Sequence, residues 1–467
     1  MKLYRKLAIL FLAVSFSSCE SFLEVEEVGR SSIPVFFKDM DGIRAALPGA
    51  YSKVYDYYDA NLMLYPDAAG DMFNMIPTGE DTKMYTQFNY QSTPQEEIGA
   101  VGYIWRDAYE ALANVNNILE YQPILLEEFP GDMRELNGIK AEALFLRALI
   151  HFDLVRVYSQ PYGFTDGAIH LGIPVLRITP GPDDNVPRNS VGEVYDQVIQ
   201  DLKLSEEIFI DHPKMDSYHA SSQAVKALLA RVYLYQENWE LARDYATMAL
   251  KNTRLAEGEE YLEMFRTISD GPESIFRLNG HLKGSTVADF YTPAGPTGYA
   301  SEKLLDLYSD SSDIRLELIN NENNATLKYY LTGLSEEERQ VDLFILRASE
   351  MYLLRAEANA QLGNLEEAAQ DLKAIRGRAL QIPVAEVDLE SGNKEELLNL
   401  ILEERAKELS FEGHRLFDLT RNERDLERYE SVNSSIEHIE YPSPLFILPI
   451  PETEINANEN IIQNQGY

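Results

Sequence analysis

The 467-residue chain contains a single cysteine, at position 19. One cysteine excludes a disulfide framework within the chain and any Cys-x-x-Cys metal or redox site. Basic residues are also scarce, with 41 Lys and Arg against 77 Asp and Glu, and the formal net charge is −36. Nucleic-acid phosphates and anionic membrane surfaces are bound through clustered Lys and Arg. The composition therefore argues against nucleic-acid partners and against charge-driven docking on a membrane.

Signatures of catalysis are missing as well. The sequence has no His-Glu-x-x-His, Gly-x-Ser-x-Gly or phosphate-loop motif. Its seven histidines show no metal-ligand spacing, and His212 and His219, which flank a proline-containing turn, are expected to be solvated. With so many acidic residues, some pair would always meet the separation of about 5 to 9.5 Å that a glycosidase needs, so the carboxylates carry no signal. We expect no enzyme, no cofactor and no metal.

The sequence does contain enough apolar surface to fold. Hydrophobic residues make up 45%, with 28 Tyr and 19 Phe. Burial of such surface offsets the entropy of the chain, so disorder is not expected. No segment after residue 18 approaches the ~18 uninterrupted apolar residues of a membrane-spanning helix.

The first residues have the pattern of an export signal. Three basic residues precede an apolar run over 7–16, which is too short to span a bilayer. Two serines and Cys19 follow, which resembles a lipoprotein signal, although Phe16 stands where Leu is usual. We predict a signal peptide over 1–18, lipidation of Cys19 and an acidic tether over 19–31. A simple secretory signal with a chance cysteine is the alternative.

Apolar residues recur at three- and four-residue intervals through most of the body, which predicts helices. The expected helices span 38–59, 103–121, 136–158, 191–209, 301–309 and 394–424. Ser190 and Glu193 have the spacing of a capping box. Trp105 and Trp239 lie inside helical patterns and are expected in the core. Loop-rich inserts are predicted over 60–99, 159–190, 253–345 and roughly 380–394.

Two segments, 222–251 and 349–376, carry the finer pattern of a tetratricopeptide helix pair. In each segment two alanines twelve residues apart allow close helix approach: Ala230 with Ala242, and Ala356 with Ala368. The segments lie much further apart than the ~34 residues of a continuous repeat. The predicted fold is therefore mostly all-α, a tetratricopeptide-like helix-pair scaffold with long inserts.

Charges of opposite sign recur at helical spacing near the C-terminal end. The residues are Glu404, Arg405, Glu408, Glu412 and Arg415. Such spacing favours ion pairs between helical turns. We expect buried or half-buried scaffold pairs rather than a catalytic group.

Several runs, taken in order, resemble the SusD/RagB family of outer-membrane nutrient-binding lipoproteins. Besides the signal they are WRDAYEALANVNNIL (105–119), KAEALFLRALIHFDLVRVY (140–158), GIPVL (172–176), PRNSVGEVYDQVIQDL (187–202), ILEERAKELSFEGHRLFDLTR (401–421) and LPIPETEINANENIIQNQGY (448–467). Each run alone is weak, but their order is specific. The resemblance implies a SusD-like α-α superhelix that forms a single domain over 32–467.

The resemblance also implies a function. Members of the family are lipid-anchored in the cell outer membrane, face the extracellular side, and deliver oligosaccharides to a SusC-like TonB-dependent transporter. The helix pairs face that transporter, and the inserts around 60–99 and 253–345 carry the ligand site. An oligopeptide-binding member of the same family is the main alternative, and a surface glycoside hydrolase is the less favoured one. The identity of the glycan or peptide stays open.

Sugars are bound by aromatic rings, which cover their C–H faces, and by polar side chains, which meet their hydroxyls. Both predicted ligand inserts contain such residues. We expect ligand contacts from Tyr65, Asp71, Asn74, Tyr85, Phe88, Tyr291, Tyr299 and Tyr329. For any single tyrosine among them, packing inside the protein is the more frequent role.

Overall fold

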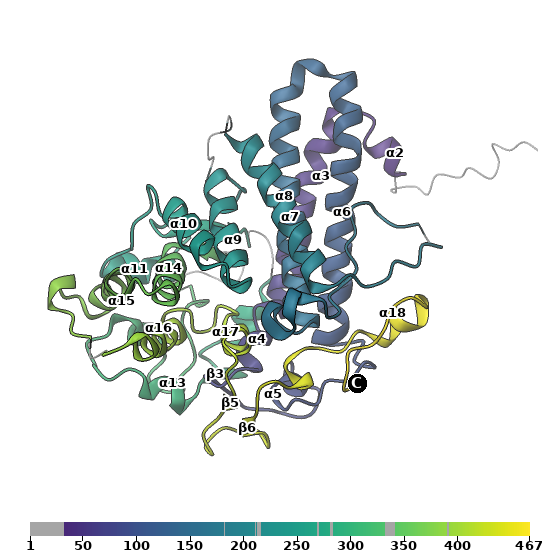
Figure 1. Ribbon diagram of the computed structural model, residues 1–467. Helices are drawn as coiled ribbons and strands as arrows, with labels where there is room; N and C mark the ends of the chain where they lie inside the picture. The colour runs from purple at the N-terminus through teal and green to yellow at the C-terminus, as the bar shows by residue number, and fades with distance from the viewer. Residues whose placement is uncertain are drawn as a thin grey trace, which may run out of the picture.

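The computed structural model describes residues 32–467 except 182, 211, 213–215, 269, 281–283, 332–340 and 390–391. The predicted signal peptide, Cys19 and the acidic tether lie outside these residues. The described chain is mostly helical, which confirms the predicted fold class. Two groups of helices lie side by side, and short elements gather below them (Figure 1).

A long helical hairpin dominates the first group and projects above the rest of the molecule (Figure 1). The helices of this group are α3 (Met40–Tyr57), α6 (Ala100–Glu128), α7 (Met133–Tyr158) and α8 (Val191–Phe209). Each covers a helix that the sequence predicts. The capping box is confirmed, because Ser190 Oγ accepts the Glu193 N–H at 3.3 Å and the Glu193 carboxylate accepts the Ser190 N–H at 2.8 Å.

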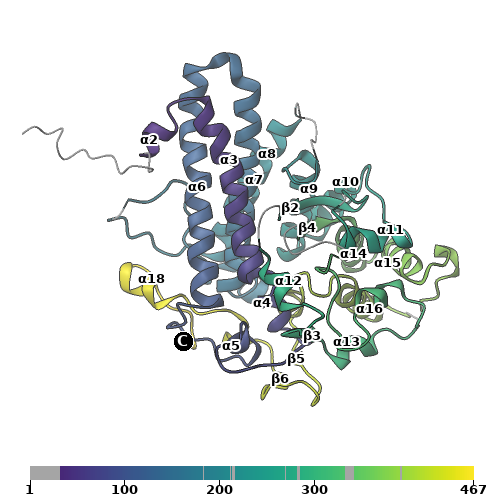
Figure 2. The ribbon, with the colours of Figure 1, turned by 180° about the vertical axis from the view of Figure 1, so that it is seen from behind.

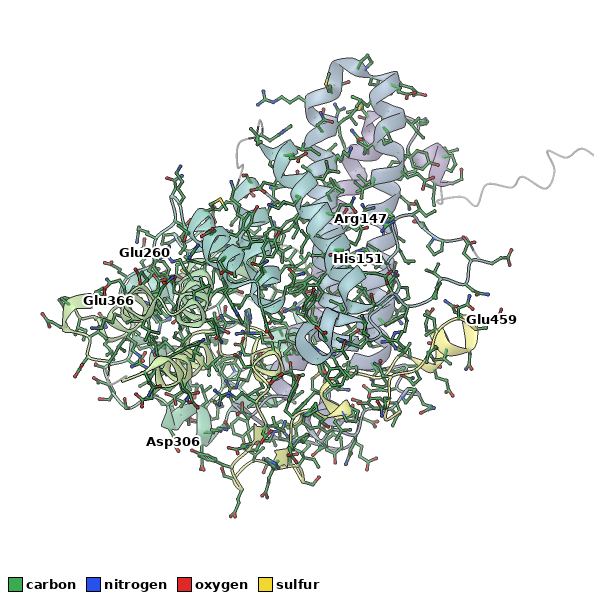
Figure 3. All side chains as sticks on the ribbon, viewed as in Figure 1. Arg147, His151, Glu260, Asp306, Glu366 and Glu459 are labelled. Carbon is green, nitrogen blue, oxygen red and sulfur yellow. The ribbon has the colours of Figure 1, made fainter. Side chains whose placement is uncertain are left out.

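A buried ion pair joins α7 to α8. Arg147 donates to the two carboxylate oxygens of Asp201 at 2.8 and 2.7 Å (Figure 3). His151 lies one turn further along α7, and burial lowers its pKa to about 3. The neutral imidazole accepts the Leu176 N–H at 3.2 Å. These contacts fix the loop that follows α7 against the helical hairpin.

The second group contains the tetratricopeptide-like pairs. Its helices are α9 (Ser222–Tyr235), α10 (Trp239–Ala249), α14 (Ala348–Leu362), α15 (Leu365–Leu380) and α16 (Lys394–Glu408). The four alanines predicted at the close approaches are fully buried. α10 packs against α14, so the two pairs are neighbours although the 253–345 insert separates them in sequence. The predicted helix-pair scaffold is confirmed.

Short elements occupy the inserts and the C-terminal segment. The α-helices are α2 (Ile33–Phe36), α4 (Tyr65–Ala68), α5 (Tyr85–Phe88), α11 (Glu259–Arg266), α12 (Thr286–Phe290), α13 (Glu302–Asp306), α17 (Arg415–Arg421) and α18 (Glu452–Ala457). A π-helical turn, η2 (Tyr58–Leu62), follows α3, and the 3-10 turns are η3 (Pro130–Asp132), η4 (Tyr162–Phe164), η5 (Asp166–Ala168), η6 (Ile314–Leu318), η7 (Val384–Glu386) and η8 (Pro444–Phe446). In the described part of the chain, no helix has both the length and the apolar character needed to cross a bilayer.

Three small antiparallel sheets, which the sequence did not predict, tie distant segments together. They pair β1 (Phe73–Met75) with β3 (Gly298–Ala300), β2 (Ser274–Leu278) with β4 (Leu343–Arg347), and β5 (Leu426–Glu427) with β6 (His438–Ile439). The first two pairs link inserts or insert ends, so the long excursions from the scaffold fold back on it.

The helix predicted over 394–424 is wrong in its middle. The chain leaves α16 after Glu408 and starts α17 only at Arg415. Phe411 and Gly413 between them adopt φ values of 64° and 73°, in the left-handed region that an α-helix cannot continue through. The predicted helix over 301–309 is also shorter, because α13 ends at Asp306.

The structure confirms one of the burial predictions for single residues and contradicts others. Trp105 is buried as predicted, whereas Trp239 is only partly buried against the core. His212 and His219 are half-buried rather than freely solvated. The His212 ring lies within hydrogen-bond distance of the Ile208 carbonyl, and His219 pairs with Asp216.

The charges predicted as scaffold pairs form a buried network. Glu404 pairs with Lys407 on the next turn of α16 at 3.0 Å, as the spacing predicts, but most of the other partners come from other segments. Arg347, at the end of β4, binds Glu408 at 2.8 Å, Glu412 at 2.7 Å and Glu273 at 3.3 Å. Arg378 of α15 binds the same Glu408 at 2.7 Å. All of these side chains are almost fully buried. The network therefore joins α15, α16 and the β2–β4 sheet through charge instead of through apolar packing alone.

A second layer of charges surrounds this core. Arg315 of η6 binds Glu408 at 3.2 Å, and Lys328 binds Glu412 at 2.6 Å. Burial alone would raise the pKa of Glu408, but the three arginines around it hold that pKa well below its usual range. The insert that carries Arg315 and Lys328 is thus held to α16 by ion pairs.

Replacing Glu408 with Gln tests the network. The change leaves buried arginines short of one carboxylate, so we expect the free energy of unfolding to fall by about 3 to 5 kcal/mol, measured by urea denaturation. Glu260→Gln is the matched control, since Glu260 pairs with Arg254 at the outer surface of the molecule (Figure 3) and should change stability little. Equal effects of the two substitutions would contradict a structural role for the buried network.

Candidate functional site

The β1–β3 sheet brings the two predicted ligand inserts together. Phe73 pairs with Ala300, Asn74 with Tyr299 and Met75 with Gly298. Below the sheet, the Phe73 ring stacks on Phe290 with centroids 6.1 Å apart. A Cβ on Gly298 would lie 2.4 Å from both rings, so only glycine fits at this register position. The two inserts therefore meet over a closely packed aromatic layer.

A third segment, the β5–β6 hairpin, covers the edge of this sheet. Asn433 in its turn donates from Nδ2 to the Met75 carbonyl at 2.8 Å and from its backbone N–H to Asn74 Oδ1 at 2.9 Å. Asn74 in return donates to the Ser431 carbonyl at 3.2 Å. Asn433 Nδ2 also lies 3.4 Å from the Tyr299 hydroxyl. Three segments far apart in sequence thus meet at Asn74.

Arg428 holds the hairpin to the first insert. Its guanidinium donates to the carbonyls of Ala68, Gly70 and Phe88 at 3.0, 2.9 and 2.6 Å. The guanidinium also lies 4.7 Å from the centroid of the Phe88 ring. Burial lowers the pKa of Arg428, whose guanidinium hydrogen-bonds to the neutral oxygens of these carbonyls and of the Ser434 hydroxyl. The Arg428 side chain therefore supplies hydrogen bonds to three backbone carbonyls that regular helix or sheet hydrogen bonds do not satisfy.

Asp71 anchors the same region through charge. Its carboxylate binds Arg415 at 2.5 Å and Lys303 at 2.8 Å, and the side chain is almost fully buried. Burial by itself would raise the pKa of Asp71, but the two cations outweigh it and lower the pKa to about 2. Asp71 therefore links the first insert to α13 and α17.

Most of the predicted ligand residues lie in the interior. Tyr65, Phe88, Tyr291 and Tyr329 are buried, and Tyr291 stacks on Tyr329 with centroids 5.9 Å apart. Asp71 and Asn74 are also buried and are engaged as described. These side chains shape the inserts, and the structure gives them no exposed face for a ligand. Tyr85 and Tyr299 are partly exposed, and their role in ligand contact stays a prediction.

Polar and aromatic groups do gather on the surface beside Tyr299. Tyr429 is 42% exposed and Asn433 is exposed. Partial burial and then Glu302 raise the pKa of Tyr299, while partial burial and then Asp306 and Glu302 raise the pKa of Tyr429. Both hydroxyls therefore lie near the carboxylates of α13. We call these five residues, Tyr299, Glu302, Asp306, Tyr429 and Asn433, the tyrosine face.

The tyrosine face lies at the end of the molecule opposite the helical hairpin. Asp306 marks it at the lower edge in Figure 3, and β3, β5 and β6 gather there in Figure 2. Sequence reasoning missed Tyr429 and Asn433 because it assigned no element between 424 and 440. The available signal was a tyrosine followed by a polar turn, Asn433-Ser434-Ser435.

The tyrosine face has the groups of a binding surface rather than of a metal centre. In the described part of the chain, no three His, Cys, Asp or Glu side chains are grouped so that they could hold a metal ion. The ring faces can cover apolar C–H surface, and the amide and carboxylates can exchange hydrogen bonds with hydroxyls.

Comparison with known proteins decides the family. Residues 243–467 match the family model described as SusD family, and residues 21–234 match the model described as starch-binding associating with outer membrane. The chain belongs to the SusD family. The resemblance inferred from the ordered sequence runs is thereby confirmed.

Individual relatives cover almost the whole chain. The SusD-like protein P38 of Formosa agariphila is 24% identical over 93% of this chain and 94% of its own length. A SusD superfamily protein of Bacteroides thetaiotaomicron has a similar structure, with a TM-score of 0.80 and 28% identity over 91% of this chain and 99% of the other. A laminarin-binding SusD-like protein shares the fold, with a TM-score of 0.70 and 20% identity over 92% and 100%.

Asp71→Asn tests how the SusD-like inserts are held. The substitution removes two buried ion pairs, so we expect a loss of about 3 kcal/mol of unfolding free energy at pH 7. Because the native pKa lies below the unfolded value of about 3.9, wild-type Asp71 stabilises the fold above pH 4 and loses this effect as pH falls through about 2. The difference between wild type and variant should therefore narrow below pH 4 in urea titrations. A constant difference would contradict this assignment, and exposed Asp196→Asn is the control.

Proposed function

We propose that the protein is a cell-surface lipoprotein that binds oligosaccharides and delivers them to a SusC-like TonB-dependent outer-membrane transporter. The tyrosine face carries this proposal, because it places two partly exposed aromatic rings beside an amide and two carboxylates where three chain segments converge. The family description as starch-binding and the laminarin-binding structural neighbour support a glycan as the ligand. Cys19 would carry the lipid anchor in this proposal.

The same geometry supports binding without turnover. A glycosidase flanks the scissile bond with two carboxylates on opposite sides. Glu302 and Asp306 are four residues apart on the short helix α13, so they project from one side of it. They can accept hydrogen bonds from hydroxyls, but they cannot enclose a glycosidic bond. Hydrolysis of any glycan by the purified protein would contradict a pure binding role.

The positions of α2 and of the tyrosine face support an orientation of the protein on the membrane. α2, the first described element, lies beside the α6–α7 hairpin in both views, whereas the tyrosine face lies at the other end (Figures 1 and 2). If the membrane lies on the side of α2, the tyrosine face is directed away from it. We propose that the helix-pair scaffold faces the transporter, so that the protein covers the transporter as a lid. Ligand binding would close this lid before import.

Alanine substitutions at Tyr299 and Tyr429 test the ligand surface. Loss of one stacking ring should weaken glycan binding about two- to tenfold, which corresponds to the ~0.5–1.5 kcal/mol of an aromatic contact. Isothermal titration with laminari-, malto- and other neutral oligosaccharides, alongside a peptide panel, measures the effect. Tyr352→Ala on α14 is the matched control, because this tyrosine is also partly exposed but belongs to the scaffold. Glycan binding that neither substitution weakens would place the site elsewhere, and binding of peptides alone would contradict the glycan proposal.

Cys19→Ala tests the anchor. Without the thiol there is no acylation, so the variant should move from the membrane fraction to the soluble fraction in cell fractionation. Glycan affinity of the purified variant should equal that of wild type, since the tyrosine face contains no residue of the predicted anchor segment. Continued membrane association of the variant would contradict lipidation at Cys19.

A further inference from the structure

A separate cleft of about 400 Å³ lies between the loop after α7 and the C-terminal segment. The loop after α7, the turn at 442–447 and the last residues of the chain form its walls. Its volume is within the range of about 300 to 1,000 Å³ that small-molecule sites occupy. None of the tyrosine-face residues lines it, so it is distinct from the surface proposed above.

The lining of this cleft contains no Asp, Glu, Lys or Arg, and burial lowers the pKa of its histidine, His170, which favours the neutral imidazole. Charged residues make up 25% of the chain, and its net charge is −36, so a neutral concave surface stands out. The cleft beside the start of α6 shows the contrast, because Glu97, Arg106 and Glu454 line it. A neutral lining offers no counter-charge to an ionic ligand and favours an uncharged one.

The remaining side chains combine apolar surface with amides. Phe164 and Leu171 are 39% and 40% exposed and present a wall for apolar C–H groups. Gln160 also lines the cleft, but its amide is not free for a ligand, because Nε2 donates to the Ser443 carbonyl at 3.0 Å and Oε1 has almost no exposed surface. Exposed Gln465 presents the amide that a ligand can reach. An exposed amide in a cleft with a partly exposed aromatic ring fits a ligand that has both hydroxyls and apolar C–H surface.

Hydrogen bonds within the protein hold the walls of the cleft in place. Asn464 donates to the carbonyls of Tyr158 and Leu448, both at 2.8 Å. Gln463 exchanges two hydrogen bonds with the backbone of Ile450, at 2.8 and 2.7 Å. A ligand would therefore not have to order these walls, which lowers the entropy cost of binding.

The backbone that lines the cleft is largely engaged. The carbonyls of Ser443 and Leu171 accept from Gln160 and Arg188, and that of Ile447 accepts from the Tyr467 hydroxyl. Peptides that bind by strand addition need free backbone groups on the receptor. The exposed Gln465 side chain offers hydrogen-bonding groups instead, which favours a hydroxylated ligand over an extended peptide.

We propose that this cleft is a second saccharide subsite, which binds a neutral sugar ring against Phe164 with the exposed Gln465 amide on its hydroxyls. The inference rests on the proposed glycan binding and adds a second point of attachment. Two separate subsites on one chain would let the protein hold a long neutral glycan at two places, which raises the apparent affinity for polymer over that for short fragments.

The substitution Phe164→Trp places a fluorescent side chain in the cleft, so that its emission reports ligand binding there. Trp105 and Trp239 are the other tryptophans, and neither lines this cleft. We expect neutral laminari- or malto-oligosaccharides to change the emission of the variant saturably, and oligogalacturonate, which is charged, to change it at least tenfold more weakly. Adding Leu171→Asp in the same background should weaken the neutral response at least tenfold, because it places a charge on the wall.

The outcomes separate this inference from the proposed function. A reporter response that survives Tyr299→Ala supports an independent subsite, even if calorimetric affinity falls. If the emission of Phe164→Trp does not change while wild type binds the same sugar by calorimetry, the second subsite is overturned and binding at the tyrosine face is not affected. A response unchanged by Leu171→Asp, or one to peptides alone, also overturns it. Folding of each variant is checked by its thermal unfolding profile.

Discussion

A buried ion network around Arg347 and Glu408 joins α15, α16 and the β2–β4 sheet and sets where the 253–345 insert meets the helical scaffold. Apolar packing is non-directional, and it builds the helix pairs of the scaffold without specifying where a long insert returns. Ion pairs in the interior have strict geometry, and each unpaired charge would be costly. Because Arg315 and Lys328 of the insert meet Glu408 and Glu412 of the scaffold, the insert has one favourable position.

The same principle continues toward the surface. Asp71 binds Arg415 and Lys303, and Arg428 clamps the backbone of the first insert. These contacts place β1, β3 and the β5–β6 hairpin side by side at one end of the molecule. The tyrosine face is therefore a surface of irregular loops held on a charged and hydrogen-bonded frame. Such a frame leaves the exposed residues free to vary with the ligand while the underlying backbone stays in place.

The two proposed subsites differ in their electrostatics. The tyrosine face includes carboxylates, which accept hydrogen bonds from hydroxyls strongly, whereas the cleft beside Phe164 has amides and no charge. One chain would thus offer two kinds of contact to the same polymer. Because the two surfaces share no residue, an extended ligand could contact both at once, whereas a compact one would contact one at a time.

Much of the scaffold was determined by local sequence. Helical periodicity predicted α3, α6, α7 and α8, and the spacing of small residues predicted the helix pairs, because these signals lie within one or two helices. The order of the SusD-like runs identified the family for the same reason. The break between α16 and α17 escaped prediction, since the left-handed residue there is Phe411 as well as Gly413.

Tertiary structure alone decided which side chains reach the surface. The aromatic residues of the inserts look alike in sequence, yet Tyr291 and Tyr329 stack in the interior while Tyr299 is partly exposed. Tyr429 and Asn433 join Tyr299 only because hydrogen bonds across more than a hundred residues bring the hairpin to β1. Local periodicity cannot encode such pairings, because strand register and buried charge partners are set by contacts between segments that are distant in the chain.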